Sequence, residues 1–272
     1  MRIAVPSKGR LREPTIQLLH DAGLAPETPG DRALAFPCRN APVEGLLVRA
    51  DDIPEYVQVG VVDCGITGID IVRESGARVT ELVKLGFGAC SLEAAVPQES
   101  EVRSLDDLRG ARVATSFPRL ARELLPGVEL VDVHGSVELA PRLGLADAIV
   151  DLVSSGSTLR TNGLRSVGVL LESEAVLVAR DDERAAPFAA MLRAVVEARR
   201  HRYVMLNAPE SSLPEICELV APRTPSVLPL AEEGMVAVHA LVPSAEVWRL
   251  LPLLEAVGGS SILIVPVERM AA

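Results

Sequence analysis

The stretch AIVDLVSSGSTL, residues 148–159, carries the strongest structural signal in this sequence. An apolar run contains one carboxylate, Asp151, and is followed by small hydroxyl residues, a glycine and a helix-forming segment. The pattern predicts a buried strand over 148–153 that leads into a helix. Free N–H groups and hydroxyls at a helix start can bind an anion, and Gly156 would let the backbone approach it closely. The stretch therefore indicates either a phosphate site or an ordinary capped helix start.

The same order of strand, loop and helix recurs at three other places. Strands are expected at 3–6, 57–64 and 112–115. The first leads through Ser7–Arg10 to a helix that stops near Gly23, and the second leads through 65–68 to a helix that stops at Gly76. The third leads through Ser116, a candidate cap, into a helix that ends near Gly127. Such repeated junctions predict an α/β fold with a parallel or mixed sheet covered by helices.

The pattern changes from residue 203 onward. Strands are expected at 203–206, 226–228, 235–242 and 262–267, with helices capped by Ser212 and Ser244. The order βαββαβ is typical of a ferredoxin-like domain. From residue 207 on, three basic residues face eight acidic ones, a net charge of −5. This balance favours a regulatory or assembly module over a phosphate site.

Composition excludes several classes of function. Lys and Arg number 27 against 37 Asp and Glu, so the net charge of −10 argues against nucleic acid or an acidic membrane surface as partner. The four cysteines form no C-x-x-C pair, and the four histidines, His20, His134, His201 and His239, share no metal-ligand spacing. No apolar run reaches the length of a membrane span, and the chain starts directly with a short strand. We therefore expect a soluble cytoplasmic protein.

Two common nucleotide motifs are absent. The sequence contains no G-x-x-x-x-G-K-[ST] loop, and no G-x-G-x-x-G stands where a strand meets a helix. A hydroxyl-rich loop beside one acid suits a phosphosugar better than a phosphoryl-transfer centre.

Residues 135–159, which read GSVELAPRLGLADAIVDLVSSGSTL, resemble the signature of the ATP phosphoribosyltransferase family. Further support comes from shorter matches along the chain: SKGRL at 7–11, DCGITG at 63–68, LGFG at 85–88, ATSFP at 114–118, PSVLPL at 225–230 and GGSSIL at 258–263. The resemblance spans nearly the whole chain.

The resemblance implies a catalytic part of the two-lobed, periplasmic-binding-protein-like (type II) fold, with the active site between the lobes. Lobe I would take residues 1–90 plus 171–205, and lobe II would take 91–170. Residues 206–272 would form the ferredoxin-like regulatory domain of the long form of the enzyme, which histidine binds and inhibits. The family also suggests a homohexamer in exchange with dimers.

The implied reaction joins adenine N1 of ATP to the anomeric carbon of phosphoribosyl pyrophosphate (PRPP), opens histidine biosynthesis, and releases pyrophosphate, with Mg²⁺ on the diphosphate. Asp151 would lie toward the ribose hydroxyls with Glu138 nearby, as the catalytic candidates. The resemblance assigns the remaining roles as follows: Ser154, Ser155, Gly156, Ser157 and Thr158 to PRPP; Lys8, Gly9, Arg10, Asp63 and Gly65 to the nucleotide; and Ser226, Ser260 and Ser261 to histidine. No side chain is assigned to the metal.

Two other functions are compatible with the same pattern. One is a two-lobed small-molecule binding protein without catalysis, because a fold does not by itself define a function. The other is a phosphoribosyltransferase of the unrelated nucleotide-salvage type. That type usually carries two adjacent acids, whereas Leu152 follows Asp151 here.

Overall fold

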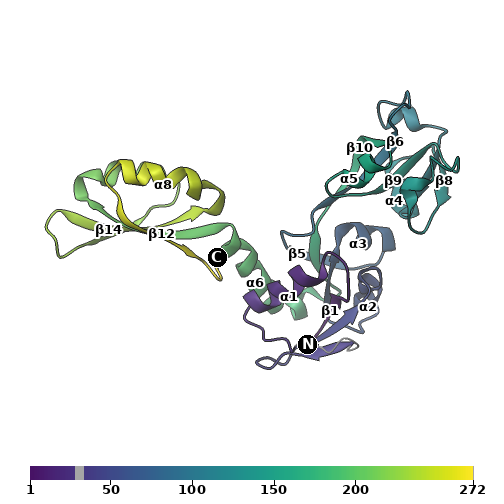
Figure 1. Cartoon of the computed structure of the whole chain (residues 1–272). Helices are drawn as coiled ribbons and strands as arrows, with labels where there is room; N and C mark the ends of the chain where they lie inside the picture. Colours follow the sequence, from purple (N-terminus) through teal and green to yellow (C-terminus); the bar gives the residue numbers. More distant parts are fainter. Residues whose placement is uncertain (28–33, 272) are drawn as a thin grey trace. The chain divides into compact units, whose positions relative to one another are not determined.

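The computed structural model describes residues 1–27 and 34–271, which divide into two compact units. The first unit takes Met1–His20 and Leu24–Ala189, and the second takes Asp21–Gly23 and the chain from Ala190 onward. The first unit contains two sheets and the second contains one (Figure 1).

Lobe I is built on a six-stranded sheet with the order β2-β3-β1-β4-β11-β5. Its strands are β1 (Arg2–Pro6), β2 (Ala35–Pro37), β3 (Glu44–Val48), β4 (Cys64–Gly68), β5 (Thr80–Lys84) and β11 (Ala175–Ala179). Strands β3, β1 and β4 are parallel, and the other three are antiparallel to their neighbours. The helices of this lobe are α1 (Arg12–Asp21), α2 (Ile53–Gln58) and α3 (Ile69–Ser75), and α6 (Asp182–Arg199) leads out of it.

Lobe II is built on a five-stranded sheet with the order β10-β6-β9-β7-β8. Its elements are β6 (Cys90–Pro97), β7 (Arg112–Thr115), α4 (Pro118–Leu124), β8 (Glu129–Asp132), β9 (Ala148–Val153), α5 (Ser157–Thr161) and β10 (Leu164–Ser173). Strands β8, β7 and β9 are parallel. The chain crosses between the lobes twice, once between β5 and β6 and once between β10 and β11.

The second unit carries a four-stranded antiparallel sheet with the order β13-β14-β12-β15. Its elements are β12 (His201–Pro209), α7 (Leu213–Val220), β13 (Ser226–Pro229), β14 (Met235–Pro243), α8 (Val247–Ala256) and β15 (Ser260–Pro266). Alternate residues of β12 and β14 point into a core beneath the two helices. The apolar faces of α7 and α8 cover the same side of the sheet and complete this core. The predicted ferredoxin-like order is confirmed. Short 3-10 helices complete the chain at η1 (Ala50–Asp52), η2 (Asp106–Leu108), η3 (Val137–Leu139), η4 (Glu210–Ser212) and η5 (Ser244–Glu246).

The structure corrects the strand expected at 57–64. That segment begins inside α2, and the strand is β4, which starts only at Cys64. Pro54 stands in the first turn of α2, where its missing N–H costs nothing. Buried Ile53 and Val57 then lie one helical turn apart and pack against the sheet. Only Val57 and Gln58 of the expected strand are helical, and residues 59–63 form the turn between α2 and β4.

Two of the expected domain boundaries fall inside strands. Residue 171 lies in β10, which pairs with β6 as far as Ser173, so the return to lobe I begins at β11. Residue 206 lies in β12, whose pairing with β14 is continuous from His201 to Pro209. The C-terminal sheet therefore needs the chain from His201 onward.

The expected caps also differ. Helix α4 has Phe117 rather than Ser116 at its N-cap, and α8 has Glu246 rather than Ser244. Ser212 is the N-cap of α7 as expected, but its side chain makes no capping bond. Each of these two serines is instead part of a 3-10 turn that precedes the α-helix. The backbone turn replaces the serine hydroxyl at these helix starts.

Candidate functional site

The parallel strands of both lobes end beside loops that carry polar residues. In lobe I, β1 and β3 end before Lys8–Arg10 and before Arg49. In lobe II, β7, β8 and β9 end before Ser116, His134 and Ser154. Ligands of open α/β sheets bind outside the carboxyl ends of the strands, so these loops mark the site region.

The loop after β9 forms a small cavity with the catalytic candidates. The cavity has a volume of about 140 Å³, and it is lined by Glu138, Asp151, Leu152, Val153, Ser154, Ser155, Gly156, Thr158 and Leu159. Of the seven residues predicted for PRPP or catalysis, only Ser157 is not in its lining. The structure thus brings the loop, Asp151 and Glu138 together around one space.

The hydroxyl loop, residues 154–158, is held open by its own contacts. Gly156 has φ +68°, and it is the N-cap of α5. The hydroxyls of Ser155 and Ser157 share a hydrogen bond of 2.9 Å, while Arg160 Nη2 donates to the Ser155 carbonyl at 3.3 Å. A Cβ at Gly156 would lie 3.1 Å from Arg160 Nη1. Glycine therefore suits the turn in both backbone conformation and space.

Asp151 has a perturbed pKa. Burial raises the pKa of its carboxyl, the N–H of Leu152 donates to Oδ1 at 2.8 Å and lowers it, and the nearby charge of Glu138 raises it. When a carboxylate is poorly solvated, a nearby cation or hydroxyl donor stabilises its charged form. Asp151 is therefore suited to meet sugar hydroxyls or a bound cation.

Arg10 joins lobe I to the hydroxyl loop. Its Nη1 donates to Ser154 Oγ at 2.9 Å, and its Nη2 donates to Cys90 Sγ at 2.8 Å. Lys8 and Gly9 are exposed on the same loop, and Gly9 has φ +82°. The structure thus brings this predicted loop to the β9 end.

Asp63 and Gly65, which were expected to bind the nucleotide, lie outside the lining of both cavities, and that role stays a prediction. Because β4 begins at Cys64, both residues lie at the amino end of the strand. Asp63 accepts the N–H of Arg2 at 2.8 Å and pairs with Arg184 at 3.3 Å. Gly65 is buried against α2, where a Cβ would collide with Ile53. The strand expected at 57–64 would have placed both residues at its carboxyl end, whereas β4 starts at Cys64.

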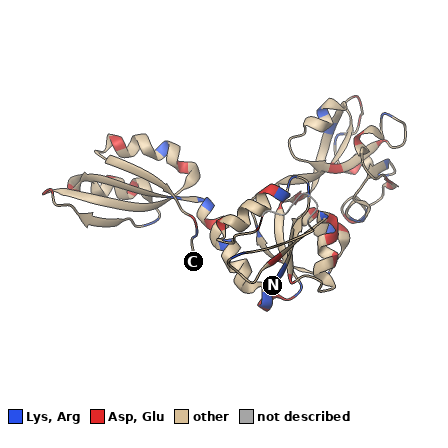
Figure 2. Ribbon diagram, turned by 60° about the horizontal axis from the view of Figure 1, so that its bottom comes forward, with Lys and Arg blue, Asp and Glu red and all other residues tan. Residues whose placement is uncertain are grey.

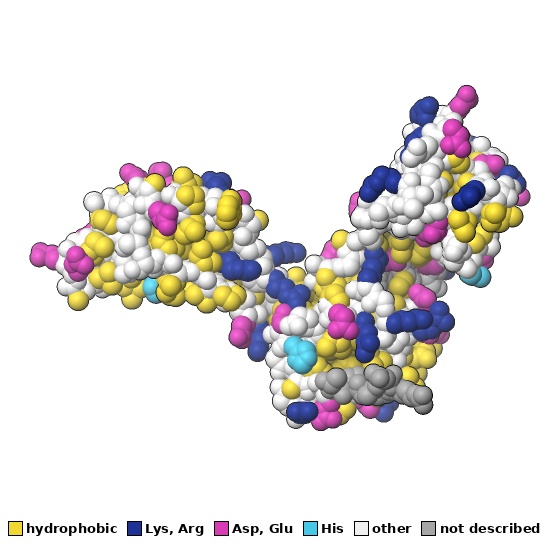
Figure 3. Space-filling view, in the orientation of Figure 1, with side chains coloured by type: hydrophobic (Ala, Val, Ile, Leu, Met, Phe, Trp, Pro, Cys, Tyr) yellow, Lys and Arg dark blue, Asp and Glu magenta, His cyan; other side chains and the backbone are white. Residues whose placement is uncertain are grey.

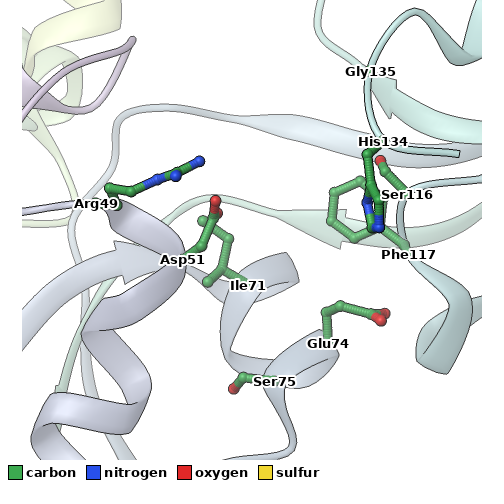
Figure 4. Close-up of a pocket in the computed structure, with 9 residues that line it drawn as sticks. All are labelled: Arg49, Asp51, Ile71, Glu74, Ser75, Ser116, Phe117, His134 and Gly135. Carbon is green, nitrogen blue, oxygen red and sulfur yellow. The ribbon is translucent and has the colours of Figure 1, made fainter.

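A larger cavity of about 570 Å³ lies between the lobes, and sequence reasoning missed it. Arg49, Asp51, Ile71, Glu74 and Ser75 line it from lobe I, and Ser116, Phe117, His134 and Gly135 line it from lobe II. Figure 4 shows Arg49 and Asp51 on one side, facing Phe117 and His134 on the other. Strands β3 and β8 were not expected from the sequence, and residues that follow the ends of these two strands line the cleft. Phe117 and His134 supply an aromatic surface, and Arg49 supplies a cation.

The predicted histidine contacts are not brought together within the C-terminal sheet. Ser226 begins β13 at one edge, while Ser260 and Ser261 begin β15 at the other. Neighbouring strands are about 4.8 Å apart, so three steps separate the edges by roughly 14 Å. Ser260 Oγ donates to the Asn207 carbonyl at 3.2 Å, and Ser261 has φ +50°. One histidine cannot contact both edges of the same sheet.

Residues 1–27 and 34–271 lack two further features. Within these ranges no three His, Cys, Asp or Glu side chains group as a metal site. Within the same ranges no helix has both the length and the apolar character needed to cross a membrane.

Comparison with known proteins gives consistent matches. Residues 49–198 match the family described as ATP phosphoribosyltransferase, and residues 198–269 match the one described as "HisG, C-terminal domain". The ATP phosphoribosyltransferase of Halobacterium salinarum is 43% identical over 281 residues, and that of Gemmatimonas aurantiaca is 42% identical over 290, each with 99% of both chains covered.

Solved structures agree with these matches. A chain of the ATP phosphoribosyl transferase (HisG:HisZ) complex from Thermotoga maritima has a TM-score of 0.62 and 26% identity, and the match covers 72% of this chain and 98% of that one. The P235GK mutant of ArgBP from T. maritima has a TM-score of 0.50 and 15% identity, with 72% and 87% covered, which is a likeness of fold alone.

The fold and site define a two-lobed α/β protein of the type II periplasmic-binding-protein class. This protein also has a ferredoxin-like domain at its C-terminal end, so the predicted fold class is confirmed. Within that class, the chain belongs to the ATP phosphoribosyltransferase family.

Proposed function

We infer that this protein is an ATP phosphoribosyltransferase of the long form, which joins adenine N1 of ATP to the anomeric carbon of PRPP and releases pyrophosphate as the first step of histidine biosynthesis. The observation that carries the assignment is the 140 Å³ cavity, in which the hydroxyl loop, Asp151 and Glu138 of the family signature meet. Full-length relatives of the same activity support it.

The hydroxyl loop would receive the 5′-phosphate of PRPP. Ser155, Gly156 and Thr158 line the cavity and offer hydroxyl and backbone donors to an anion. Asp151 would accept hydrogen bonds from the ribose hydroxyls, and this would orient the anomeric carbon. Arg10, which already touches the loop through Ser154, would place its cation near the diphosphate.

The 570 Å³ cavity beside the loop would receive ATP. Its volume lies within the usual range of small-molecule sites. Phe117 and His134 offer ring faces to a purine, and Arg49 offers a cation to its phosphates. His134 and Gly135 line the larger cavity and Glu138 lines the smaller one, so the nucleophile and the anomeric carbon would meet near residues 134–138.

Mg²⁺ fits this donor set in one particular way. Mg²⁺ commonly binds through one or two carboxylates together with substrate phosphates, rather than in an all-protein cage. Asp151 and Glu138 share one cavity, so they are the residues that would hold the ion. When bound, it would neutralise charge on the departing diphosphate. Asp151, with its raised pKa, must be deprotonated to take part.

Feedback inhibition by histidine would belong to the C-terminal domain. Eight acidic residues from Asn207 onward give this part of the chain a negative balance that suits a cationic amino group. The C-terminal family match covers the same region. Because the serines lie at opposite edges, we assign the contact to Ser260 and Ser261, at the start of β15, where Ser261 has a positive φ of 50°.

A homo-oligomer, which the family suggests is a hexamer in exchange with dimers, is supported by the open face of the C-terminal sheet. Apart from Arg202, its strands carry no charged residue, and Figure 2 shows the charges of this domain mainly on its helices and loops. Leu228, Leu263 and Val265 are exposed, and Figure 3 shows hydrophobic side chains spread over the domain surface. Light scattering tests the size of the assembly.

A cytoplasmic location remains a prediction.

One assay tests the activity. The protein is mixed with Mg²⁺, PRPP and either ATP or a panel of free bases, and pyrophosphate release is measured. We expect pyrophosphate release when ATP is added to PRPP and Mg²⁺, and no release when a free base replaces ATP. Release with a free base in place of ATP would indicate a salvage-type enzyme, and binding without release would indicate a binding protein.

A further inference from the structure

Helix α4 of lobe II begins without a side-chain cap from its own lobe. Its N-cap residue, Phe117, has no acceptor in its side chain, and Pro118 at the start of the helix has no N–H. Thr115 Oγ1 accepts the N–H of Phe117 at 2.9 Å. The N–H groups of Arg119 and Leu120 are therefore the next donors that need an acceptor.

Glu74, on α3 of lobe I, supplies both acceptors. Its Oε1 accepts the N–H of Arg119 at 2.9 Å, and its Oε2 accepts the N–H of Leu120 at 2.9 Å. A carboxylate bound in this way is favoured by the positive end of the helix. Figure 4 shows the Glu74 side chain extending from α3 toward the lobe II side of the cleft. The cap of α4 is thus provided across the cleft.

A second contact runs in the opposite direction. Gly76 ends α3 with φ +64°, and a Cβ on this residue would collide with the guanidinium of Arg119. The cation of lobe II therefore lies at the carboxyl end of the lobe I helix, where it is favoured. A carboxylate from α3 thus lies at the start of α4, and a guanidinium from α4 lies at the end of α3.

The other end of α3 is bound to the chain crossover. Asp70 is only 1% exposed, and its carboxylate accepts the hydroxyl of Ser173 at 2.5 Å. In return, the Ser173 oxygen accepts the N–H of Asp70 at 3.1 Å. Ser173 is the last residue of β10, immediately before the chain returns to lobe I. Helix α3 is therefore held to lobe II at both ends.

We propose that Glu74 is an interlobe latch: a positioning residue that sets the separation of the lobes and so the width of the cleft. Glu74 and Phe117, which precedes α4, both line the 570 Å³ cavity. Withdrawal of Glu74 from α4 widens that cavity and separates Arg49 from the ring of Phe117. The kinetic consequence rests on the proposed function, in which the two substrates meet across the lobes.

The kinetic test compares Glu74→Ala and Glu74→Gln with the wild-type protein. If only a fraction of the variant molecules is competent to bind, the apparent affinity is multiplied by that fraction. We therefore expect KM for both substrates to rise roughly three- to tenfold, with kcat within about twofold of the wild-type value. Glu74→Asp keeps the charge and should lie nearer the wild type. Glu81→Gln is the matched control, because Glu81 is an exposed carboxylate of the same lobe on β5, and it should leave KM unchanged.

A distance measurement tests the latch without any activity. Spin labels are attached to Glu55→Cys on α2 and Glu129→Cys on β8, both exposed positions, in a Cys217→Ser background. The other three cysteines are buried. We expect Glu74→Ala to lengthen or broaden the interlobe distance distribution, and Glu81→Gln to leave it unchanged. Circular dichroism verifies that each variant is folded.

The outcomes separate the latch from the function. Unchanged distances in folded Glu74→Ala overturn the latch, and so does a fall in kcat with KM unaltered, since that places Glu74 in the chemistry. If the wild-type protein releases no pyrophosphate, the proposed function fails while the distances still decide the latch.

Discussion

At the scale of single residues, the hydroxyl loop offers the most direct test of PRPP binding. Thr158→Ala removes one hydroxyl from the 140 Å³ cavity. We expect PRPP binding to weaken by about 1–3 kcal/mol, the range for a hydrogen bond to a charged group. Calorimetric titration with PRPP measures it. Unchanged affinity in a folded variant would contradict the phosphate assignment.

Gly156→Val should weaken PRPP binding more than Thr158→Ala does. Gly156 has φ +68°, which a β-branched residue adopts only with strain, and the new side chain would also press on Arg160. The same titration compares the two variants, with Gly110→Val as a control for strain. Gly110 has φ +78° at a position with no neighbour within 4 Å of its Cβ. An equal effect of both glycine variants on PRPP binding would show that strain alone is responsible.

Asp151→Asn should lose most activity while keeping stability. The pKa of Asp151 is raised in the folded protein, so the folded state holds the proton more tightly than the unfolded state does. Its effect on stability therefore becomes less favourable as pH rises from the ordinary pKa through the raised one. The amide removes this cost, so the melting temperature of the variant relative to wild type should rise across that window. A variant that melts lower at pH 7 but keeps its specific activity would make Asp151 structural.

At the scale of elements, β4 packs closely against α2 at Gly65. Gly65→Ala introduces a Cβ that collides with Ile53 and lies 3.2 Å from Val57 and 3.3 Å from Ala4. We expect a loss of about 1–3 kcal/mol in the free energy of unfolding, as for other overpacked cores. Urea unfolding measures this loss. The KM for ATP should stay at the wild-type value, and a selective rise in that KM without loss of stability would restore Gly65 to the binding site.

At the scale of the whole molecule, histidine should inhibit through the C-terminal domain. Ser260→Phe places a large side chain at the β15 edge and should relieve inhibition while kcat is retained. A coupling of about 1–3 kcal/mol is enough for such inhibition. Ser226→Phe is the matched control, since Ser226 begins β13 at the far edge of the sheet. Inhibition that is unchanged in Ser260→Phe, or calorimetry without histidine binding, would leave this domain an assembly element.

The sequence by itself determined the elements whose signals are local. The turn after β9, the stop of α3 at Gly76 and the βαββαβ order follow from backbone hydrogen bonding and turn chemistry within a few residues. The match to the family signature then identified Asp151 and Glu138, which the structure brings to one cavity.

Only the tertiary structure decided what depends on strand order. Arg49 and His134 share a cleft because β3 and β8 end at it, and no local pattern encodes the pairing of strands far apart in sequence. The same reason separates Ser226 from Ser260, which begin strands at opposite edges of one sheet. Asp63 and Gly65 lie at the amino end of an interior strand of lobe I, because β4 starts only at Cys64. The capping role of Glu74 could not be predicted from the sequence either, because the helix that it caps belongs to the other lobe.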